Sequence, residues 1–261
     1  MNQKPIIEKH FNEYAQFWHD KLKIYTFEAR RKGVIHLSKK GSYVSVLDIG
    51  CGTGDYAPFF DSRFYLGLDI SDKMIEKARE LYPEYDFRKS DAEKTGLNSS
   101  EWDLVLSIAV FEYLDDPEPH MSELARLVKV GGRVIIAVQN GEDKSKIRDE
   151  KFVNKLIFLK SLKKKLLPDA KLIAAQNPNK DPSIIHHKHT EGNMKSLGLK
   201  YGLKQVDKCF IDTVVIPSPL DQYLHLNPFF SQFMQRKFPK SIFNGYIRNH
   251  SRCLIIMFEK I

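Results

Sequence analysis

The spacing of apolar residues changes repeatedly along the first 140 residues. Between residues 7 and 37, apolar side chains recur at steps of three and four residues, which predicts a helical segment. Beyond it, short aliphatic and β-branched runs predict five strands, at residues 43–49, 64–70, 85–88, 102–109 and 133–138. Strands that alternate with helical patterns at this spacing predict a doubly wound parallel sheet of the α/β class.

Helical patterns fill the intervals between these strands. A short helix is expected at 56–60. Ser71 precedes helically spaced apolar residues and is therefore expected to be an N-cap residue. A further helix is expected at 121–130, ended by the glycine pair Gly131 and Gly132.

Polar residues gather where the predicted strands end. Asp48 and a glycine-rich turn close the first strand, Asp69 ends the second, Asp91 follows the third, and residues 107–113 follow the fourth. In sheets of this kind, ligands bind beyond the carboxyl ends of the strands, where the strand order reverses. The sequence therefore predicts one binding site that these strand ends share.

The glycine turn at 50–54 allows the backbone to approach a ligand closely, because glycine has no Cβ. Asp69 follows Gly50 by 19 residues, close to the offset at which an acidic residue grips ribose hydroxyls. Dinucleotide folds use G-x-G-x-x-G, whereas here the third glycine falls one position earlier and Asp55 follows it. A carboxylate there would repel a pyrophosphate. The pattern favours a ligand with ribose and adenine but no phosphate.

Five segments together resemble a known family. Residues 46–54, VLDIGCGTG, closely resemble the first motif of the class I S-adenosylmethionine-dependent methyltransferases. Later motifs of that family are similar, in order and spacing, to residues 67–71, 90–93, 102–107 and 127–132.

The resemblance implies a Rossmann-like sheet of seven strands whose last strand runs antiparallel, with residues 251–260 as the candidate. It also implies an N-terminal helical lid at 1–42 and an S-adenosylmethionine-binding core at 43–140. The remainder, 141–261, is expected to hold insertions that form an acceptor cap, together with the last two strands.

Eleven residues of these motifs are implied to bind S-adenosylmethionine or to close its site: Asp48, Gly50, Cys51, Gly52, Gly54, Asp69, Ile70, Asp91, Ala92, Ser107 and Ile108. In the family, the glycine turn contacts the methionine portion, and Asp48 is implied to lie near its ammonium group. Asp69 is implied to take the ribose hydroxyls while Ile70 flanks the adenine. Asp91 and Ala92 are implied to cover the adenine edge.

The N-terminal segment is expected to cover the cofactor. Trp18, with Phe11 and Tyr14, resembles the lid helix of the family, although packing in the core accounts for such aromatic residues as well. Arg30 or Arg31 is placed to meet the cofactor carboxylate.

No motif identifies a catalytic base, and the candidates are His186, His189 and Tyr113. Tyr113 stands where relatives often carry a histidine, and simple packing beside the cofactor is the alternative. His186, His187 and His189 precede a helical stretch that ends at Gly198. Their placement resembles a histidine near the acceptor pocket of several small-molecule methyltransferases, and a solvated segment is the alternative. Three histidines without acidic neighbours do not indicate a metal site.

The net charge of +8 is divided unevenly along the chain. Residues 1–140 hold 19 Lys and Arg against 22 Asp and Glu, a net charge of −3, and residues 141–261 carry +11. Residues 151–167 place lysines between helically spaced apolar residues, which predicts a basic amphipathic helix. It is either a cap with a solvated lysine face or a peripheral contact with an anionic membrane. Residues 217–245 are rich in aromatic side chains and imply burial against the core, a partner or a hydrophobic acceptor.

The sequence also predicts the compartment. Three cysteines without paired spacing argue against a disulfide framework or a zinc site and fit a reducing cytosol. The N-terminus lacks the apolar core of a signal peptide, and no apolar run approaches the roughly 20 residues of a membrane span. A cytoplasmic location, with peripheral membrane contact left open, is expected.

These patterns predict a methyltransferase that uses S-adenosylmethionine, releases S-adenosylhomocysteine, and methylates a small hydrophobic acceptor at oxygen or carbon. An RNA methyltransferase is one alternative. Against it, base N-methyltransferases usually carry Asn/Asp-Pro-Pro-Tyr/Phe after the fourth strand, where this chain has Ala-Val-Phe-Glu at 109–112. A cofactor-binding module without turnover is the other alternative.

Overall fold

The computed structural model describes residues 3–21, 25–143, 183–213 and 251–261. The chain divides into two compact units. The first consists of residues 1–141, 183–211 and 253–261. The second, residues 142–182 and 212–252, lies almost entirely outside the described ranges.

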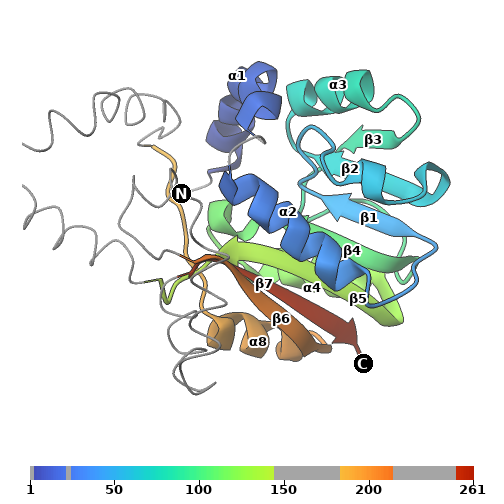
Figure 1. The fold of residues 1–261 in the computed structure, drawn as a ribbon, viewed down its shortest axis with the longest axis vertical. Helices are drawn as coiled ribbons and strands as arrows, with labels where there is room; N and C mark the ends of the chain where they lie inside the picture. Colours follow the sequence, from blue (N-terminus) through green and yellow to red (C-terminus); the bar gives the residue numbers. More distant parts are fainter. Residues whose placement is uncertain (1–2, 22–24, 144–182, 214–250) are drawn as a thin grey trace, which may run out of the picture. The chain divides into compact units, whose positions relative to one another are not determined.

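The described residues form a seven-stranded sheet with the strand order β3-β2-β1-β4-β5-β7-β6 (Figure 1). Its strands are β1 (Val46–Ile49), β2 (Tyr65–Asp69), β3 (Asp86–Lys89), β4 (Trp102–Ile108), β5 (Val128–Gln139), β6 (Leu203–Thr213) and β7 (Ser251–Lys260). Pairs among β1 to β5 are parallel, whereas β7 runs antiparallel to β5. The expected doubly wound sheet is confirmed, including the antiparallel strand at 251–260.

Helices and short 3-10 turns connect the strands: α1 (Lys4–Lys21), α2 (Tyr25–Ser38), η1 (Ala57–Phe59), η2 (Ser62–Phe64), α3 (Asp72–Leu81), η3 (Phe111–Tyr113), α4 (Glu118–Leu127) and α8 (Glu191–Lys200). The helical pattern at 7–37 thus corresponds to two helices, α1 and α2. Ser71 caps α3 as expected, because its hydroxyl accepts a hydrogen bond from the Met74 N–H at 3.1 Å.

Alternate residues of the central strands face two hydrophobic cores, one on each side of the sheet. Leu104 and Leu106 of β4 join Val34 of α2 in one buried cluster. Val105, between them in the chain, joins Met121 of α4 in the other. Figure 1 shows α2 lying across one face of the sheet. Because both faces are covered, ligands have access to the sheet only at its strand ends.

The helix expected at 121–130 is wrong at its carboxyl end. α4 ends at Leu127, and Val128 already has an extended backbone (φ −74°, ψ 141°) and begins β5. Val128 is fully buried and pairs with Trp102 of β4. Burial of a β-branched side chain in the sheet prevails over continuation of the helix. The glycine pair Gly131 and Gly132 lies inside β5.

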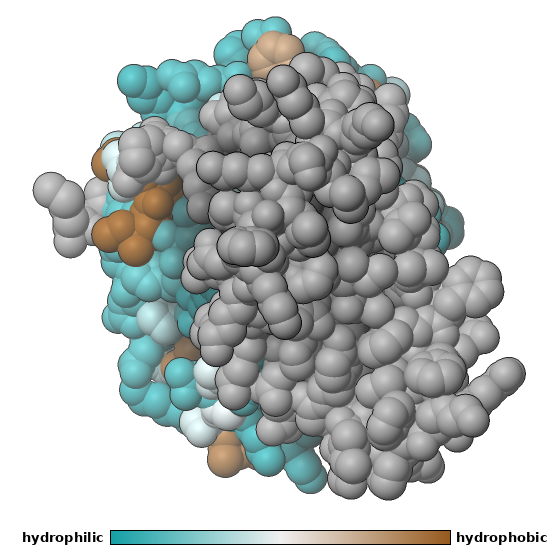
Figure 2. All heavy atoms as spheres, turned by 60° about the vertical axis from the view of Figure 1, so that its left-hand side comes forward, coloured by the Kyte–Doolittle hydropathy of each residue, from teal (hydrophilic) through white to brown (hydrophobic). Residues whose placement is uncertain are grey.

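The basic helix expected at 151–167 and the apolar insertion at 217–245 lie outside the described residues, so the acceptor cap and the boundaries of the three parts stay predictions. In the part of the chain that is described, no helix combines the length and apolar character that crossing a bilayer requires. Figure 2 shows the described surface on one side as mainly hydrophilic, with apolar residues at separate places.

Candidate functional site

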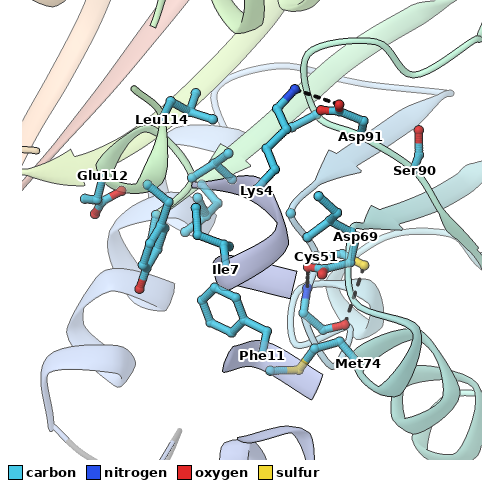
Figure 3. A pocket seen from close by; sticks show the side chains of 18 of the residues that line it. Lys4, Ile7, Phe11, Cys51, Asp69, Met74, Ser90, Asp91, Glu112 and Leu114 are labelled. Atoms are coloured by element: carbon cyan, nitrogen blue, oxygen red, sulfur yellow. Dashed lines mark hydrogen bonds and ion pairs between the residues drawn. The ribbon is translucent and has the colours of Figure 1, made fainter. Parts of the chain in front are cut away.

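A cavity of about 630 Å³ lies at the carboxyl ends of the parallel strands (Figure 3). Its wall includes the glycine turn after β1, the end of β2, the loop after β3 and the residues that follow β4. α1 and α2 contribute further residues. β2 and β4 lie on opposite sides of β1, so the cavity stands at the switch point where doubly wound sheets bind ligands.

Two glycines of the turn bring backbone to the cavity wall. Gly50 and Gly52 have positive φ angles of 76° and 54°. A Cβ on Gly50 would lie 2.3 Å from Cγ2 of Val110. A Cβ on Gly52 would meet no atom closer than Nε1 of Trp18, at 3.4 Å. Gly50 is therefore required by close packing, whereas Gly52 leaves space beside a bare backbone.

Asp69 holds its carboxylate against the glycine turn at the end of β2. Oδ2 accepts the Gly52 N–H at 2.9 Å, and Oδ1 accepts the Ser71 N–H at 2.9 Å. Burial raises the pKa of Asp69, and the backbone donors partly counter that rise. Each oxygen keeps a further lone pair for a ligand hydroxyl. The carboxylate is thus fixed in orientation at the cavity wall, in a form suited to a cis-diol.

Lys4 of α1 links the first helix to the loop after β3. Its Nζ lies 2.7 Å from Oδ2 of Asp91 and 2.7 Å from Oε2 of Glu93. Burial disfavours the ammonium, but the two carboxylates prevail and raise the pKa of Lys4. This ion-pair cluster forms part of the cavity wall.

Gln3 fixes the chain just before α1. Its Nε2 donates to Oδ1 of Asp115 at 2.6 Å, and its Oε1 accepts the Ile185 N–H at 2.7 Å. Gln3 is 4% exposed and lines the cavity. Residues far apart in the chain therefore meet at this point.

Ser107 and Ala92 are joined by a buried histidine that the sequence pattern did not single out. His120 of α4 is fully buried, with Nε2 2.8 Å from Oγ of Ser107 and Nδ1 2.8 Å from the Ala92 carbonyl oxygen. Because a carbonyl only accepts, Nδ1 carries the proton, and the Ser107 hydroxyl donates to Nε2. His120 thereby positions both the end of β4 and the loop after β3.

The structure brings most of the residues predicted to bind the cofactor to one cavity. Those that line it are Gly50, Cys51, Gly52, Asp69, Ile70, Asp91, Ala92 and Ile108. Gly54 and Ser107 do not line it. Gly54 packs instead under Phe87, whose Cζ would be 2.7 Å from an added Cβ.

Asp48 also lies away from the cavity wall. Its side chain is fully buried, and Oδ2 accepts the Tyr65 hydroxyl at 2.8 Å. Burial raises the pKa of Asp48 to about 7, with the Tyr65 hydrogen bond opposing that rise. The Asp48 carboxylate is therefore bonded to Tyr65 of β2 and does not form part of the cavity wall.

Of the three candidate bases, only Tyr113 lines the cavity. Its ring packs edge-on against His186, with the centroids 5.0 Å apart, and His186 itself is exposed. His189 is 9% exposed, and its ring Nε2 lies 3.1 Å from the Phe111 carbonyl oxygen. Its backbone N–H donates to the Gln139 carbonyl oxygen. His189 therefore secures the segment before α8 to the residues after β4.

Aromatic side chains of α1 form another part of the wall. Phe11 packs edge-on against Trp18 at 5.7 Å and against Tyr113 at 5.2 Å between ring centroids. Figure 3 shows Ile7 and Phe11 between Glu112 on one side and Asp69 and Met74 on the other. An apolar surface thus separates the two polar ends of the cavity.

Comparisons with known proteins identify the family. Residues 47–136 match the family model described as a methyltransferase domain. A phosphatidylethanolamine N-methyltransferase from Cereibacter sphaeroides is 31% identical over 44% of this chain and 59% of its own length. A malonyl-[acyl-carrier protein] O-methyltransferase from Ilyobacter polytropus is 29% identical over 54% of this chain and 52% of its own. Magnesium protoporphyrin IX methyltransferase from Synechocystis PCC 6803, crystallised with S-adenosylhomocysteine, shares the fold over the full length of both chains, with a TM-score of 0.58 at 16% identity.

Residues 47–136 form a methyltransferase domain of the class I S-adenosylmethionine-dependent type, and the described chain has the fold of those enzymes. The chain matches 59% and 52% of the lengths of the two curated relatives.

The cavity of the methyltransferase fits S-adenosylmethionine, the cofactor of the family. Gly52 presents bare backbone to the cavity, and Asp69 presents a fixed carboxylate beside it. Arg30 lines the cavity, and its buried Nε has no hydrogen-bond partner among the described residues. A guanidinium in that position suits the carboxylate of the methionine portion.

We expect His120 to make the methyltransferase sensitive to acid. Burial lowers the pKa of His120 to about 4, so the folded state resists a proton that the unfolded state takes below about pH 6.5. Stability is therefore lost as the pH falls from about 6.5 to about 4, by about 3 kcal/mol for this group. Denaturant titrations across this range should show a steeper loss for the native protein than for His120→Gln. Equal pH dependence of the two proteins would contradict the assignment.

Proposed function

We propose that this methyltransferase moves a methyl group from S-adenosylmethionine to a small-molecule acceptor. The main support is one cavity that has Asp69 and the glycine turn at one end and Glu112 at the other (Figure 3). Its volume, about 630 Å³, falls within the range of small-molecule sites.

The residues at the Asp69 end are suited to hold the nucleoside. Asp69 would accept the ribose hydroxyls, Ile70 would flank the adenine, and Asp91 with Ala92 would cover its edge. Arg30 would pair with the cofactor carboxylate. Four of these residues stand at strand ends that meet at the switch point, which supports the assignment.

The sulfonium of S-adenosylmethionine supplies an already activated methyl group. The protein's task is then to align an acceptor with that group and to exclude water. Positioning of this kind contributes roughly 7–11 kcal/mol to catalysis. Ile7, Phe11, Trp18 and Leu114 line the cavity with apolar surface, which supports a dry reaction site.

The acceptor atom that receives the methyl group is oxygen, carbon or nitrogen. Residues 217–245, which suggested a hydrophobic acceptor, lie outside the described residues, and methylation at oxygen or carbon stays a prediction. The curated relatives include an N-methyltransferase and an O-methyltransferase. A buried carboxyl, Glu112, at the end of the cavity away from Asp69 favours nitrogen as the second candidate.

Methyl transfer from labelled S-adenosylmethionine into a cell extract tests the proposal. The extract is separated into lipid, RNA, protein and small-molecule pools, and label is expected in the small-molecule or lipid pool. Calorimetry with S-adenosylhomocysteine provides an independent measure of the cofactor site. Label in RNA would favour the RNA methyltransferase, and cofactor binding without label in any pool would favour a module without turnover.

Contact of residues 151–167 with an anionic membrane, from a cytoplasmic location, remains a separate proposal supported by the lysine pattern alone. Flotation with anionic liposomes is expected to retain the native protein and to lose a variant with those lysines changed to glutamine. Equal flotation of both proteins would contradict the membrane contact and favour a role of residues 151–167 as a cap.

A further inference from the structure

Glu112 is a buried carboxyl on the cavity wall with one oxygen unused by the described residues. Its side chain is 2% exposed, and it belongs to η3, directly after β4. Oε1 accepts the Gln139 N–H at 3.1 Å, which fixes the rotation of the carboxyl group. Oε2 is buried and has no hydrogen-bond partner among the described residues. A buried carboxylate oxygen without a partner costs several kcal/mol, so its retention indicates a ligand.

Arg30 carries a positive charge that acts on Glu112 but leaves its Oε2 without a hydrogen bond. Among the described residues, Arg30 forms no hydrogen bond with Oε2 of Glu112, and its guanidinium lies 5.2 Å from the Phe27 ring centroid. Arg30 nevertheless influences Glu112: burial raises the pKa of Glu112 to about 7, and the guanidinium opposes that rise. Among the described residues, Nε of Arg30 and Oε2 of Glu112 are both left without a hydrogen-bond partner, and Arg30 is the group proposed to bind the cofactor carboxylate.

Carboxylates outnumber cationic side chains among the charged residues of the cavity wall. Its cationic side chains are Lys4, Arg30 and Arg31, and its carboxylates are Asp55, Asp69, Asp91, Glu93, Glu112, Asp115 and Asp116. An acceptor that reacts as an anion would be repelled by such a wall. A group that is positive after methylation would be stabilised by it.

We infer that Glu112 binds the nucleophilic group of the acceptor through Oε2, and that this group is a primary or secondary amine. The inference rests on the proposed function. An amine N–H donates to Oε2, and the same bond turns the nitrogen lone pair away from the carboxylate, toward the interior of the cavity. The amine is held between Glu112 and the apolar surface formed by Ile7 and Leu114.

The transfer balances in charge and atoms. The amine nitrogen forms the new bond to the methyl carbon while the carbon–sulfur bond breaks and its electron pair stays on sulfur. Positive charge thus passes from sulfur to nitrogen. The methylated ammonium then gives its N–H proton to Oε2 of Glu112, which later releases it to solvent. A carboxyl with a pKa near neutral is suited to exchange this proton.

The test begins with the product. The protein is incubated with S-adenosylmethionine that carries a deuterated methyl group and a small-molecule extract, and the labelled compounds are identified by mass spectrometry. N-methyl amines are expected. Labelled ethers, esters or C-methyl compounds would overturn the inference and leave the proposed function intact. Absence of any labelled compound would contradict both the inference about Glu112 and the proposed function.

The second step uses the amine so identified and the isosteric variant Glu112→Gln, which keeps an oxygen for the Gln139 N–H. We expect kcat/KM for the amine to fall at least tenfold, with affinity for S-adenosylhomocysteine unchanged within twofold. Calorimetry of the amine with protein saturated by S-adenosylhomocysteine should show the same loss of binding. Glu84→Gln, at an exposed surface glutamate, is the matched control and should match the native protein. Full amine binding by Glu112→Gln would overturn the inference.

A pH profile separates this role from a structural one. The native kcat/KM should rise through about pH 7 as Glu112 ionises, and this inflection should be absent in Glu112→Gln. The other titratable groups on segments packed against Glu112 are Arg30, Tyr113, His187 and His189. Burial raises the pKa of Tyr113 and lowers that of His189, so neither gains charge in this range. An inflection that persists in Glu112→Gln would assign the proton to another group.

Discussion

Replacing Asp69 with alanine is expected to weaken binding of S-adenosylhomocysteine at least about 100-fold. The carboxylate is proposed to accept both ribose hydroxyls, and hydrogen bonds to a charged group contribute about 1.5–3 kcal/mol each. The substitution also removes the acceptor of the Gly52 N–H and the Ser71 N–H, both at 2.9 Å. The glycine turn then loses one of its bonds to β2, while the Gly50 and Cys51 N–H groups still donate to the Leu68 carbonyl oxygen. Calorimetry with S-adenosylhomocysteine measures the change directly.

Two further variants sharpen the result. Asp69→Asn keeps one carbonyl oxygen but presents an N–H₂ group in place of the other, so an intermediate loss is expected. Asp86→Ala removes an exposed carboxylate that pairs with Arg88, and it should bind like the native protein. Unchanged affinity in Asp69→Ala would remove the ribose assignment and, with it, the main support for the cofactor end of the cavity.

Replacing Gly50 with alanine is expected to destabilise the protein by about 2–5 kcal/mol and to impair cofactor binding. The new Cβ would lie 2.3 Å from Cγ2 of Val110, and Gly50 has a φ of 76°. The first effect is overpacking, which costs about 1–3 kcal/mol, and the second is a left-handed backbone, which costs about 1–2 kcal/mol. Chemical denaturation measures the sum.

Gly131→Ala isolates the backbone contribution. Gly131 has a φ of 75°, nearly that of Gly50, and a Cβ added there would meet nothing within 4 Å. Gly131→Ala should therefore lose less stability than Gly50→Ala, and the difference should equal the cost of overpacking at Gly50. Val110→Ala combined with Gly50→Ala should recover part of that component relative to Gly50→Ala alone. Equal losses at Gly50 and Gly131 would show that the contact with Val110 relaxes without cost.

Local patterns in the sequence were sufficient for the sheet and for much of the cavity. The strands of the central sheet are buried on both faces, so they form continuous apolar runs that are easily distinguished from helices. Asp69 and Asp91 stand at strand ends, and parallel topology alone brings strand ends together. Ser71 is followed by a helical pattern, and its capping bond depends only on neighbouring residues.

Contacts between segments that are distant in the sequence could not be predicted from local sequence patterns. Lys4 meets Asp91 across 87 positions, and His120 reaches the Ala92 carbonyl across 28. Neither partner carries a local signal, because a lysine near a helix start and a histidine in a helix are ordinary surface residues in most chains. Asp48 differs in another way: its place beside the glycine turn was expected, but its carboxylate turns inward to Tyr65. Side-chain direction at that point depends on the neighbouring strand.

The two residues that open the described chain contact both ends of the cavity. Lys4 is bonded to Asp91 at the nucleoside end of the cavity, and the adjacent Gln3 is bonded to Asp115 and to the Ile185 N–H at the other end. A dipeptide cannot release one end without disturbing the other. Contacts at the two ends of the cavity are therefore connected through adjacent residues, so that displacing Lys4 is expected to disturb the contacts of Gln3 as well.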